Sequence, residues 1–340
     1  MKVSKTGRWW RWLQWPLWAL LPTVAALVWW VNAPLSLRLT PGQAVLDLRV
    51  PLGAAAPRVV RDATAAGLDE PSWLLLWGLR ASGQAHLIKA GSYEVTPGTT
   101  PWQLLDKLVS GDQALRRVTL LEGWTFAQMR EAIRKAEHIT IGEQALEGDF
   151  LMKTLGKDGL HPEGRFFPDT YVYPKHASEL DVWRQAASAM DKKLAQAWAM
   201  RQPGLPLKTP DEALTLASIV EKETGLDADR AQVAGVFINR LRLGMRLQTD
   251  PAVIYGVGPA LQGRLRRRHL DTDTPYNTYT RAGLPPTPIA MPGWASLQAA
   301  VQPAATRALY FVARGDGSSQ FSATLDEHNQ AVRRYILNKP

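Results

Sequence analysis

The sequence predicts a mixed α+β protein of 340 residues, in which an apolar N-terminal segment precedes two folded regions. Residues 12–31 carry no charge, whereas short strand-like runs alternate with capped helical patterns through the rest of the chain. The hydrophobic content of 46% and charged content of 21% are those of a folded chain. We therefore expect a transmembrane helix, a small αβ subdomain, and a larger α+β domain whose helices rest on a small antiparallel sheet.

The N-terminal segment has the features of a retained single-pass anchor. Residues 12–31 match the length of about 20 apolar residues that a spanning helix needs. Tryptophans at both ends resemble interfacial belts, and a basic cluster precedes the span, which places residues 1–11 in the cytoplasm and the body outside. A cleaved signal peptide is the alternative, but Asn32-Ala33-Pro34 is a poor cleavage site. The basic cluster is Lys2, Lys5, Arg8 and Arg11.

Charge and cysteine content exclude several classes of function. Of the net charge of +9, four charges lie in residues 1–11, and the remaining excess is too weak to indicate nucleic acid as a partner. The absence of cysteine excludes disulfides, thiolate catalysis and cysteine-bound metal. No residue spacing suggests a metal site and no glycine-rich phosphate loop is present, so we expect no cofactor.

Residues 32–114 are predicted to be a linker followed by a small subdomain. Residues 34–57 read as an extended linker, with alternating apolar positions around Leu46–Val50, and helices are expected over 57–67 and 72–80. A strand over 88–95, a Thr96-Pro97-Gly98 turn and a helix over 101–110, capped by Thr100, then follow. This strand–turn–helix resembles the LysM glycan-binding module.

Residues 115–340 are predicted to form the larger domain. Helices are expected over 125–136, 181–200, 294–301 and 325–337, and strands over 116–121, 309–313 and 320–322. A cluster of aromatic, proline and acidic residues at 161–171 has no clear periodicity. It fits either a sugar-binding surface or a packed loop with aromatic residues in the core.

The central helix of this domain is predicted to begin at Thr209-Pro210 and to end at Glu223, near Gly225. Thr209 and Glu212 have the spacing of a capping box. Glu223 falls on an apolar face of this helix, and Glu221, roughly 200° away, lies on a face that is also fairly apolar. A carboxyl at the end of an apolar stripe is partly desolvated, which raises its pKa and suits a general acid. The alternative is that Glu221, Lys222 and Glu223 form a solvated helix turn.

Further polar residues follow the central helix. A second helix is expected over 228–243, capped by Asp227, with the pair Asn239-Arg240 late in an otherwise apolar pattern. A short third helix begins at Asp250-Pro251. Residues 274–280 offer hydroxyl, amide and aromatic groups to a sugar chain. Each polar residue alone is typical of a cap or a structural hydrogen bond, but together they could line one groove.

Several ordered motifs resemble the MltG-type (YceG-like) endolytic murein transglycosylases. The resemblance covers most of residues 115–336 and extends less sharply toward the N-terminus. The motifs are Ala217-Ser-Ile-Val-Glu-Lys-Glu-Thr224, Val236-Phe-Ile-Asn-Arg-Leu241, Gly244-Met-Arg-Leu-Gln-Thr-Asp-Pro251, Tyr276-Asn-Thr-Tyr279, Gly283-Leu-Pro-Pro286 and Glu327-His-Asn329.

This resemblance implies a bacterial inner-membrane protein with a cytoplasmic N-terminus, a LysM-like subdomain and a periplasmic catalytic domain. It implies non-hydrolytic cleavage of MurNAc–GlcNAc β-1,4 bonds within peptidoglycan strands, which leaves 1,6-anhydro-MurNAc ends and controls strand length beside the peptidoglycan synthases. The catalytic acid/base of the family is the second acid of the Glu-Lys-Glu motif, here Glu223. We expect no cofactor or metal in this chemistry.

From motif position we hypothesise a set of substrate-binding residues around Glu223. Two alternatives to the transglycosylase stay open. One is a non-enzymatic anchored scaffold that binds peptidoglycan or its synthases. The other is a two-carboxylate glycoside hydrolase that uses Glu223 with Glu163 or Asp250. The predicted substrate-binding residues are Asn239, Arg240, Gln248, Asp250, Tyr276, Asn277 and Glu163.

Overall fold

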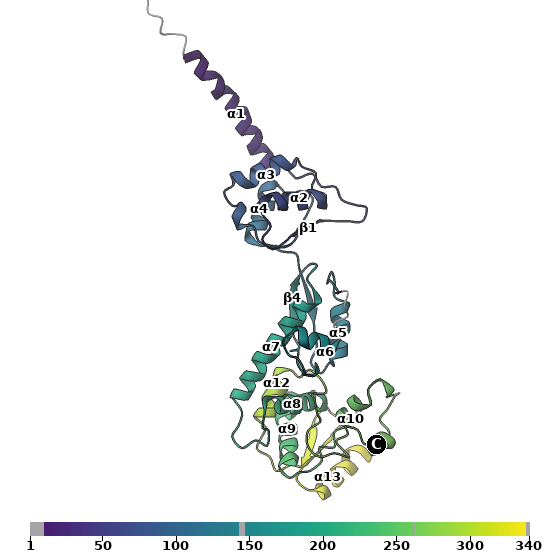
Figure 1. Cartoon of the computed structure of the whole chain (residues 1–340). Helices are drawn as coiled ribbons and strands as arrows, with labels where there is room; N and C mark the ends of the chain where they lie inside the picture. Colours follow the sequence, from purple (N-terminus) through teal and green to yellow (C-terminus); the bar gives the residue numbers. More distant parts are fainter. Residues whose placement is uncertain (1–9, 143–146, 262, 338–340) are drawn as a thin grey trace, which may run out of the picture. The chain divides into compact units, whose positions relative to one another are not determined.

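The structure is a computed structural model that describes residues 10–142, 147–261 and 263–337 (Figure 1). The chain forms two compact units. The first contains the chain up to Arg116 together with Pro174–His176, and the second contains Arg117–Tyr173 and the chain from Ala177 onward. Both consist of helices with small two-stranded sheets, which confirms the predicted α+β class.

The N-terminal element is helix α1 (Trp10–Asn32), which covers the segment predicted to be an anchor. Over the residues that the structure describes, no helix is both long and apolar enough to cross a membrane. The membrane span predicted over 12–31 therefore stays a prediction.

The first unit contains a two-stranded antiparallel sheet covered by helices. Strand β1 (Leu46–Val50) pairs with β2 (Gly91–Val95), with Leu46 opposite Val95. The prediction that residues 34–57 are a linker was therefore wrong for Leu46–Val50. The alternating apolar positions at Leu46–Val50 are the local sign of this strand, but so short a pattern also fits an extended linker, and the partner strand lies about 45 residues later. Around the sheet lie α2 (Ala56–Ala66), α3 (Ser72–Ala81), a short 3₁₀ turn (Ala85–Leu87) and α4 (Pro101–Ser110).

Helix α4 begins as the sequence predicts, because Thr100 and Gln103 form a capping box with proline at the first helical position. It ends at Gly111, whose φ of 78° permits the left-handed turn that closes the helix. Leucines from α4 join residues of both strands and of α2 in one apolar core.

The second unit contains two apolar cores. One core joins α5 (Phe126–Arg134), α6 (Gly148–Thr154), the first half of α7 (Glu179–Ala199) and β4 (Thr170–Pro174), which pairs with β3 (Leu115–Thr119). Phe166 and Tyr171 are buried in this core. The core alternative for the cluster at 161–171 is thus confirmed for these two side chains, and β4 and α6 are elements that the sequence did not reveal.

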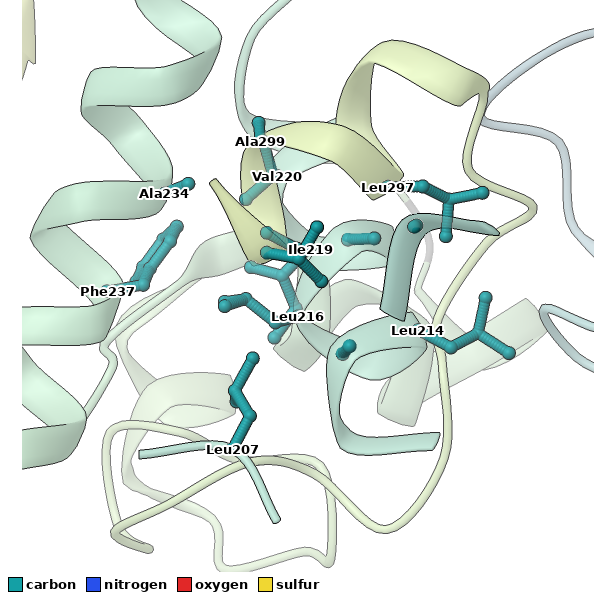
Figure 2. Close-up of a cluster of buried hydrophobic side chains, with 14 of the residues drawn as sticks. Leu207, Leu214, Leu216, Ile219, Val220, Ala234, Phe237, Leu297 and Ala299 are labelled. Atoms are coloured by element: carbon teal, nitrogen blue, oxygen red, sulfur yellow. The ribbon is translucent and has the colours of Figure 1, made fainter. Parts of the chain in front are cut away.

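The other core surrounds α8 (Pro210–Glu223), the predicted central helix. Helices α9 (Asp227–Arg242) and α12 (Trp294–Val301) pack against it. Figure 2 shows Leu216, Ile219 and Val220 of α8 beside Phe237 of α9, with Leu297 of α12 nearby.

The remaining elements of the second unit follow this core. They are α10 (Asp250–Val257), a 3₁₀ turn (Gly258–Ala260), α11 (Arg267–Asp271), the antiparallel hairpin of β5 (Tyr310–Ala313) and β6 (Ser319–Ser322), α13 (Leu325–Val332) and a final π-helical turn (Arg333–Leu337).

Candidate functional site

The candidate site lies at the carboxyl end of α8. Thr209 caps the amino end through the N–H of Glu212, although the Glu212 carboxylate accepts from the N–H of Lys208 rather than completing the predicted capping box. Every residue from 213 to 220 is buried. The helix is therefore enclosed on all sides, and polar chemistry becomes possible only where it ends, at Glu221, Lys222 and Glu223.

Glu223 is the last residue of α8, and the residue is half-buried. Burial raises the pKa of its carboxyl, and the nearby negative charge of Asp250 raises it further. The hydroxyl of Thr249 donates a hydrogen bond to Oε1, and this contact and the charge of Arg240 lower the pKa. Among the described residues, no other hydrogen bond to this carboxyl is found. The result is a carboxyl whose pKa lies above its ordinary value, so it gives up its proton less readily to solvent than an exposed glutamate does.

Thr249 is held in place by backbone contacts with Thr278. The Thr278 hydroxyl accepts from the N–H of Thr249 at 2.9 Å and donates to the Thr249 carbonyl at 3.2 Å. The N–H of Gln248 donates to the Thr278 carbonyl at 3.1 Å. Gln248 adopts a positive φ of 50° and its side chain is exposed. This segment therefore places the Thr249 hydroxyl against Glu223 and leaves the Gln248 amide open to solvent.

Asp250 lies beside the same carboxyl, in the first turn of α10. Its carboxylate accepts a hydrogen bond of 2.7 Å from the hydroxyl of Tyr279. Burial and the neighbouring Asp250 raise the pKa of Tyr279, which therefore remains a hydrogen-bond donor at any physiological pH. Asp250 is exposed, so this end of α10 presents a carboxylate to solvent next to Glu223.

Arg240 is buried and supports the segment that precedes Thr249. Its guanidinium donates 2.7 Å hydrogen bonds to the carbonyls of Leu247 and Leu309. It also lies over the ring of Tyr310, 5.2 Å from the centroid. Arg240 thus joins α9, the 247–249 segment and β5, while its charge acts on Glu223.

Three of the predicted substrate-binding residues make contacts inside the second unit. The side-chain amide of Asn239 donates to the carbonyls of Thr306 and Ala308, at 2.9 and 3.1 Å. Asn277 is buried; its amide donates to the carbonyls of residues 269, 270 and 272. The hydroxyl of Tyr276 lies 2.8 Å from that of Thr287. These contacts organise loops, which is the structural role that the sequence had left open for such residues.

Glu163 is enclosed away from solvent, with 3% of its surface exposed. Its carboxylate accepts from the N–H of Phe126 at 2.9 Å and from the hydroxyl of Tyr255 at 3.1 Å. Burial raises the pKa of Glu163 to about 7. Its partners lie on α5 and α10, so this carboxyl ties two helices together inside the unit.

The first acid of the Glu-Lys-Glu motif has a different environment from the second. Glu221 accepts hydrogen bonds from the N–H of Gly293 at 3.0 Å and from the hydroxyl of Ser296 at 2.7 Å. Its carboxylate lies 3.7 Å from the guanidinium of Arg230, and both side chains are buried. Glu221 therefore fixes α8 against the start of α12, and Glu223 faces the 247–250 segment.

Comparison with known proteins assigns the chain to a family. The family model described as the YceG-like family matches residues 48–334, which is most of the chain. The chain belongs to the YceG-like family. The motifs singled out in the sequence lie within the matched region.

Several relatives of this YceG-like chain have names that state an activity. The chain is 33% identical over 269 residues to the endolytic murein transglycosylase of Bacillus subtilis, with 74% of each chain covered. It is 27% identical over 344 positions to the endolytic murein transglycosylase of Streptococcus pneumoniae strain D39; that match covers 87% of this chain but 62% of the pneumococcal protein. The crystal structure of a yceG-like protein from Listeria monocytogenes matches with a TM-score of 0.52 and 28% identity, over 84% of this chain and 98% of that one.

The structure adds Thr249 and Tyr279 to the surroundings of Glu223, neither of which had been selected from the sequence. Both lie inside quoted motifs of this YceG-like chain, Thr249 directly before Asp250-Pro251 and Tyr279 at the end of Tyr276-Asn-Thr-Tyr279. Their positions next to chosen residues were the only available signal. Among the described residues, no group of three or more His, Asp or Glu could hold a metal ion.

Proposed function

We propose that this protein is an endolytic murein transglycosylase that cleaves MurNAc–GlcNAc β-1,4 bonds within peptidoglycan strands, with Glu223 as its single acid/base. Family membership and relatives that carry this name support the reaction class. The observation on which the role of Glu223 rests is its desolvated carboxyl, which has a raised pKa and is bonded by Thr249.

The proposed reaction needs one carboxyl that works in both protonation states. Protonated Glu223 gives its proton to the glycosidic oxygen, and the bond from that oxygen to the anomeric carbon of MurNAc breaks. The MurNAc C6 hydroxyl attacks the anomeric carbon and forms the new C–O bond, and its proton returns to the Glu223 carboxylate. The products are a 1,6-anhydro-MurNAc end and a free GlcNAc hydroxyl, and no water is consumed.

The exposed groups beside Glu223 suit the recognition of a polar sugar chain. Gln248 and Asp250 present an amide and a carboxylate on one short segment, and Tyr279 holds Asp250 in position. We propose that Gln248 and Asp250 bind saccharide hydroxyls, whereas Asn239 and Asn277 act by holding the loops around them.

A two-carboxylate hydrolase is the second candidate, and the position of Asp250 is the observation that favours it. Asp250 is close enough to Glu223 to raise the pKa of that carboxyl, and it is exposed to solvent. Such a site would use Asp250 to activate water. Glu163 is less suited to that role because its carboxylate is enclosed and bonded on both oxygens.

The location of the reaction is also part of the proposal. We propose that α1 anchors the chain in the inner membrane with residues 1–11 in the cytoplasm, so that the second unit acts on strands in the periplasm beside peptidoglycan synthases. The uncharged stretch from Trp12 to Val31, with its flanking basic cluster, supports this orientation. Glycan contact by the LysM-like region belongs to the same proposal.

The test is mass spectrometry of the products that the full-length protein forms from purified, uncross-linked glycan strands. We expect internal cleavage and new ends that lack one water relative to a reducing end. Glu223→Gln should abolish both. Glu212→Gln is the matched control, because it makes the same change on a half-buried residue at the opposite end of the same helix, and it should leave the products unchanged.

Other outcomes select the alternatives. Fragments with hydrated reducing ends would show that the enzyme is a two-carboxylate hydrolase and not a transglycosylase. Loss of those fragments in Asp250→Asn would then identify Asp250 as the second carboxylate. If folded wild-type protein in membranes does not cleave the strands, the remaining interpretation is the non-enzymatic anchored scaffold.

A further inference from the structure

The first unit carries an apolar, tryptophan-rich surface that its own core does not cover. We propose that this surface docks the first unit on the lipid bilayer at the boundary between headgroups and acyl chains. The contact is independent of the catalytic proposal and goes beyond a simple N-terminal anchor, because the groups that make it belong to α3 and α4. The exposed fractions of the residues concerned are 71% for Trp73, 48% for Trp77 and 54% for Trp102.

The first eight residues of helix α3 are apolar on all sides, yet only part of this surface packs on the core. These residues, Ser-Trp-Leu-Leu-Leu-Trp-Gly-Leu, carry no charge. Leu75 faces the core, whereas Trp73 and Trp77 are one helical turn apart and share an exposed face. A helix that is hydrophobic all round is ordinarily enclosed by protein or lipid. This exposed face therefore needs a cover.

Trp77 and Trp102 border an apolar groove between α1, α3 and α4 with a volume of about 350 Å³. The wall from α1 includes Val28 and Trp30, and a Cβ added to Gly78 of α3 would lie 3.2 Å from the Trp30 ring. The groove is thus formed where the carboxyl end of α1 passes directly over α3. An acyl chain is the kind of ligand that such walls can enclose.

The apolar surface continues from the groove along α1. Four exposed apolar residues of that helix extend it, and the chain carries no charge from residue 12 to residue 37. A lipid bilayer explains this continuity, because the bilayer that covers α1 would also cover the face of α3 beside it. The four residues are Leu21, Val24, Val28 and Trp29.

The chemistry of the groove favours lipid over a glycan or a polar peptide. Tryptophan combines an apolar body with one N–H donor, which matches the boundary between acyl chains and headgroups. Sugar sites need several well-placed polar groups. Among the described residues that line the groove, Asn32 and Ser82 are the polar ones apart from the indole groups.

The absence of cysteine allows a direct test, because one introduced cysteine carries one label. Full-length Arg80→Cys with a nitroxide would be reconstituted in vesicles of phosphatidylethanolamine and phosphatidylglycerol. Arg80 is exposed and lies three residues after Trp77, on the same face of α3. At each label we measure how often it collides with oxygen, which enters lipid, relative to a nickel chelate, which stays in water. The reference is Asp112→Cys, an exposed site beyond the far end of α4. We expect the oxygen-to-nickel ratio at Arg80→Cys to be several-fold higher than at Asp112→Cys.

Variants of the surface sharpen the test. Combining Trp77→Ala and Trp102→Ala should lower the Arg80 ratio to that of Asp112, whereas Leu52→Ala should not, although Leu52 is another exposed apolar residue of this unit. An equal oxygen-to-nickel ratio at Arg80 and Asp112, in proteins that keep Trp77 and Trp102, would overturn the proposal. This comparison does not depend on whether the tryptophan variants fold. Disulfide-linked dimers through Arg80→Cys in vesicles would assign the surface to a second copy. Shielding of the label by soluble glycan strands instead of vesicles would assign it to glycan.

Discussion

The hydrogen bond from Thr249 to Glu223 makes a quantitative prediction about the pH dependence of activity. This contact favours the carboxylate form of Glu223, so its loss raises the pKa of the acid above the wild-type value. A hydrogen bond to a charged group contributes about 1.5–3 kcal/mol and one to a neutral group about 0.5–1.5 kcal/mol. The difference of about 1–1.5 kcal/mol corresponds to about one pH unit.

Thr249→Val removes the hydroxyl and keeps the shape of the side chain. The contacts of Thr249 with Thr278 use backbone atoms of residue 249, so they survive the substitution. The reaction begins with protonated Glu223, and activity is lost as pH rises through its pKa. The alkaline limb of the rate profile should therefore move to higher pH by about one unit in Thr249→Val.

The assay is the initial rate of formation of anhydro ends from soluble glycan strands, followed by mass spectrometry across pH. Thr249→Ser is the matched control, because it keeps the donor and should keep the wild-type profile. A limb that moves to lower pH would refute the reasoning, since loss of the hydroxyl would then have lowered the pKa of the titrating acid instead of raising it. An unmoved limb in a folded Thr249→Val protein would show that the titrating group is not Glu223.

Three further predictions concern stability, measured by urea unfolding. Glu163 has a raised pKa of about 7 in the folded state, against 4.5 for an ordinary carboxyl, so the native state binds more protons between these values. Stability should fall by about 3 kcal/mol from pH 4.5 to pH 8, and Glu163→Gln should flatten this slope. Asn277→Ala should lose about 1–3 kcal/mol, because the loop carbonyls of residues 270 and 272 lose the hydrogen bonds that the buried amide donates. Unchanged stability combined with weaker glycan binding would instead support a role for Asn277 in binding substrate. Glu221→Ala should destabilise by about 1–3 kcal/mol, because the buried guanidinium of Arg230 then relies on the exposed Asp227, 3.3 Å away. A loss below about 1 kcal/mol, as at an exposed ion pair, would contradict the role of the buried pair.

Local sequence signals predicted the helices well, because caps and prolines act within a few residues. Helix α12 has the predicted bounds, and the capping box at Thr100 was read from residues three apart. Strand β1 carried the alternation of a strand at Leu46–Val50, but this short pattern alone did not separate it from an extended linker, because its partner lies about 45 residues later. The short helix α6 follows Glu147 and has no Ser, Thr, Asp or Asn at its cap position and no proline in its first turn, so no local start signal marked it.

The candidate site was predictable in its position but not in its contacts. The end of an apolar helix with acids was visible in the sequence, and the family resemblance pointed to Glu223. The choice between the two acids could not come from helical faces, because every residue of α8 from 213 to 220 is buried, whichever face it lies on. It depends on what packs at the helix end, and those partners lie 26 residues away for Glu223 and 72–75 residues away for Glu221. Asn239 was likewise judged by its type, while its partners are carbonyls 67 and 69 residues later.

The two acids of the motif are best understood as one arrangement. Glu221 is fixed by two donors near the start of α12 and by Arg230, which sets the rotation of the last turn of α8. Two residues later along a helix the side chain points roughly 200° away, so a fixed Glu221 directs Glu223 toward the opposite side. There Glu223 meets Thr249 and the charge of Asp250, at a helix end whose dipole also disfavours a carboxylate. The spacing of one residue between the acids thus separates an acid that holds the helix from an acid that can hold a proton.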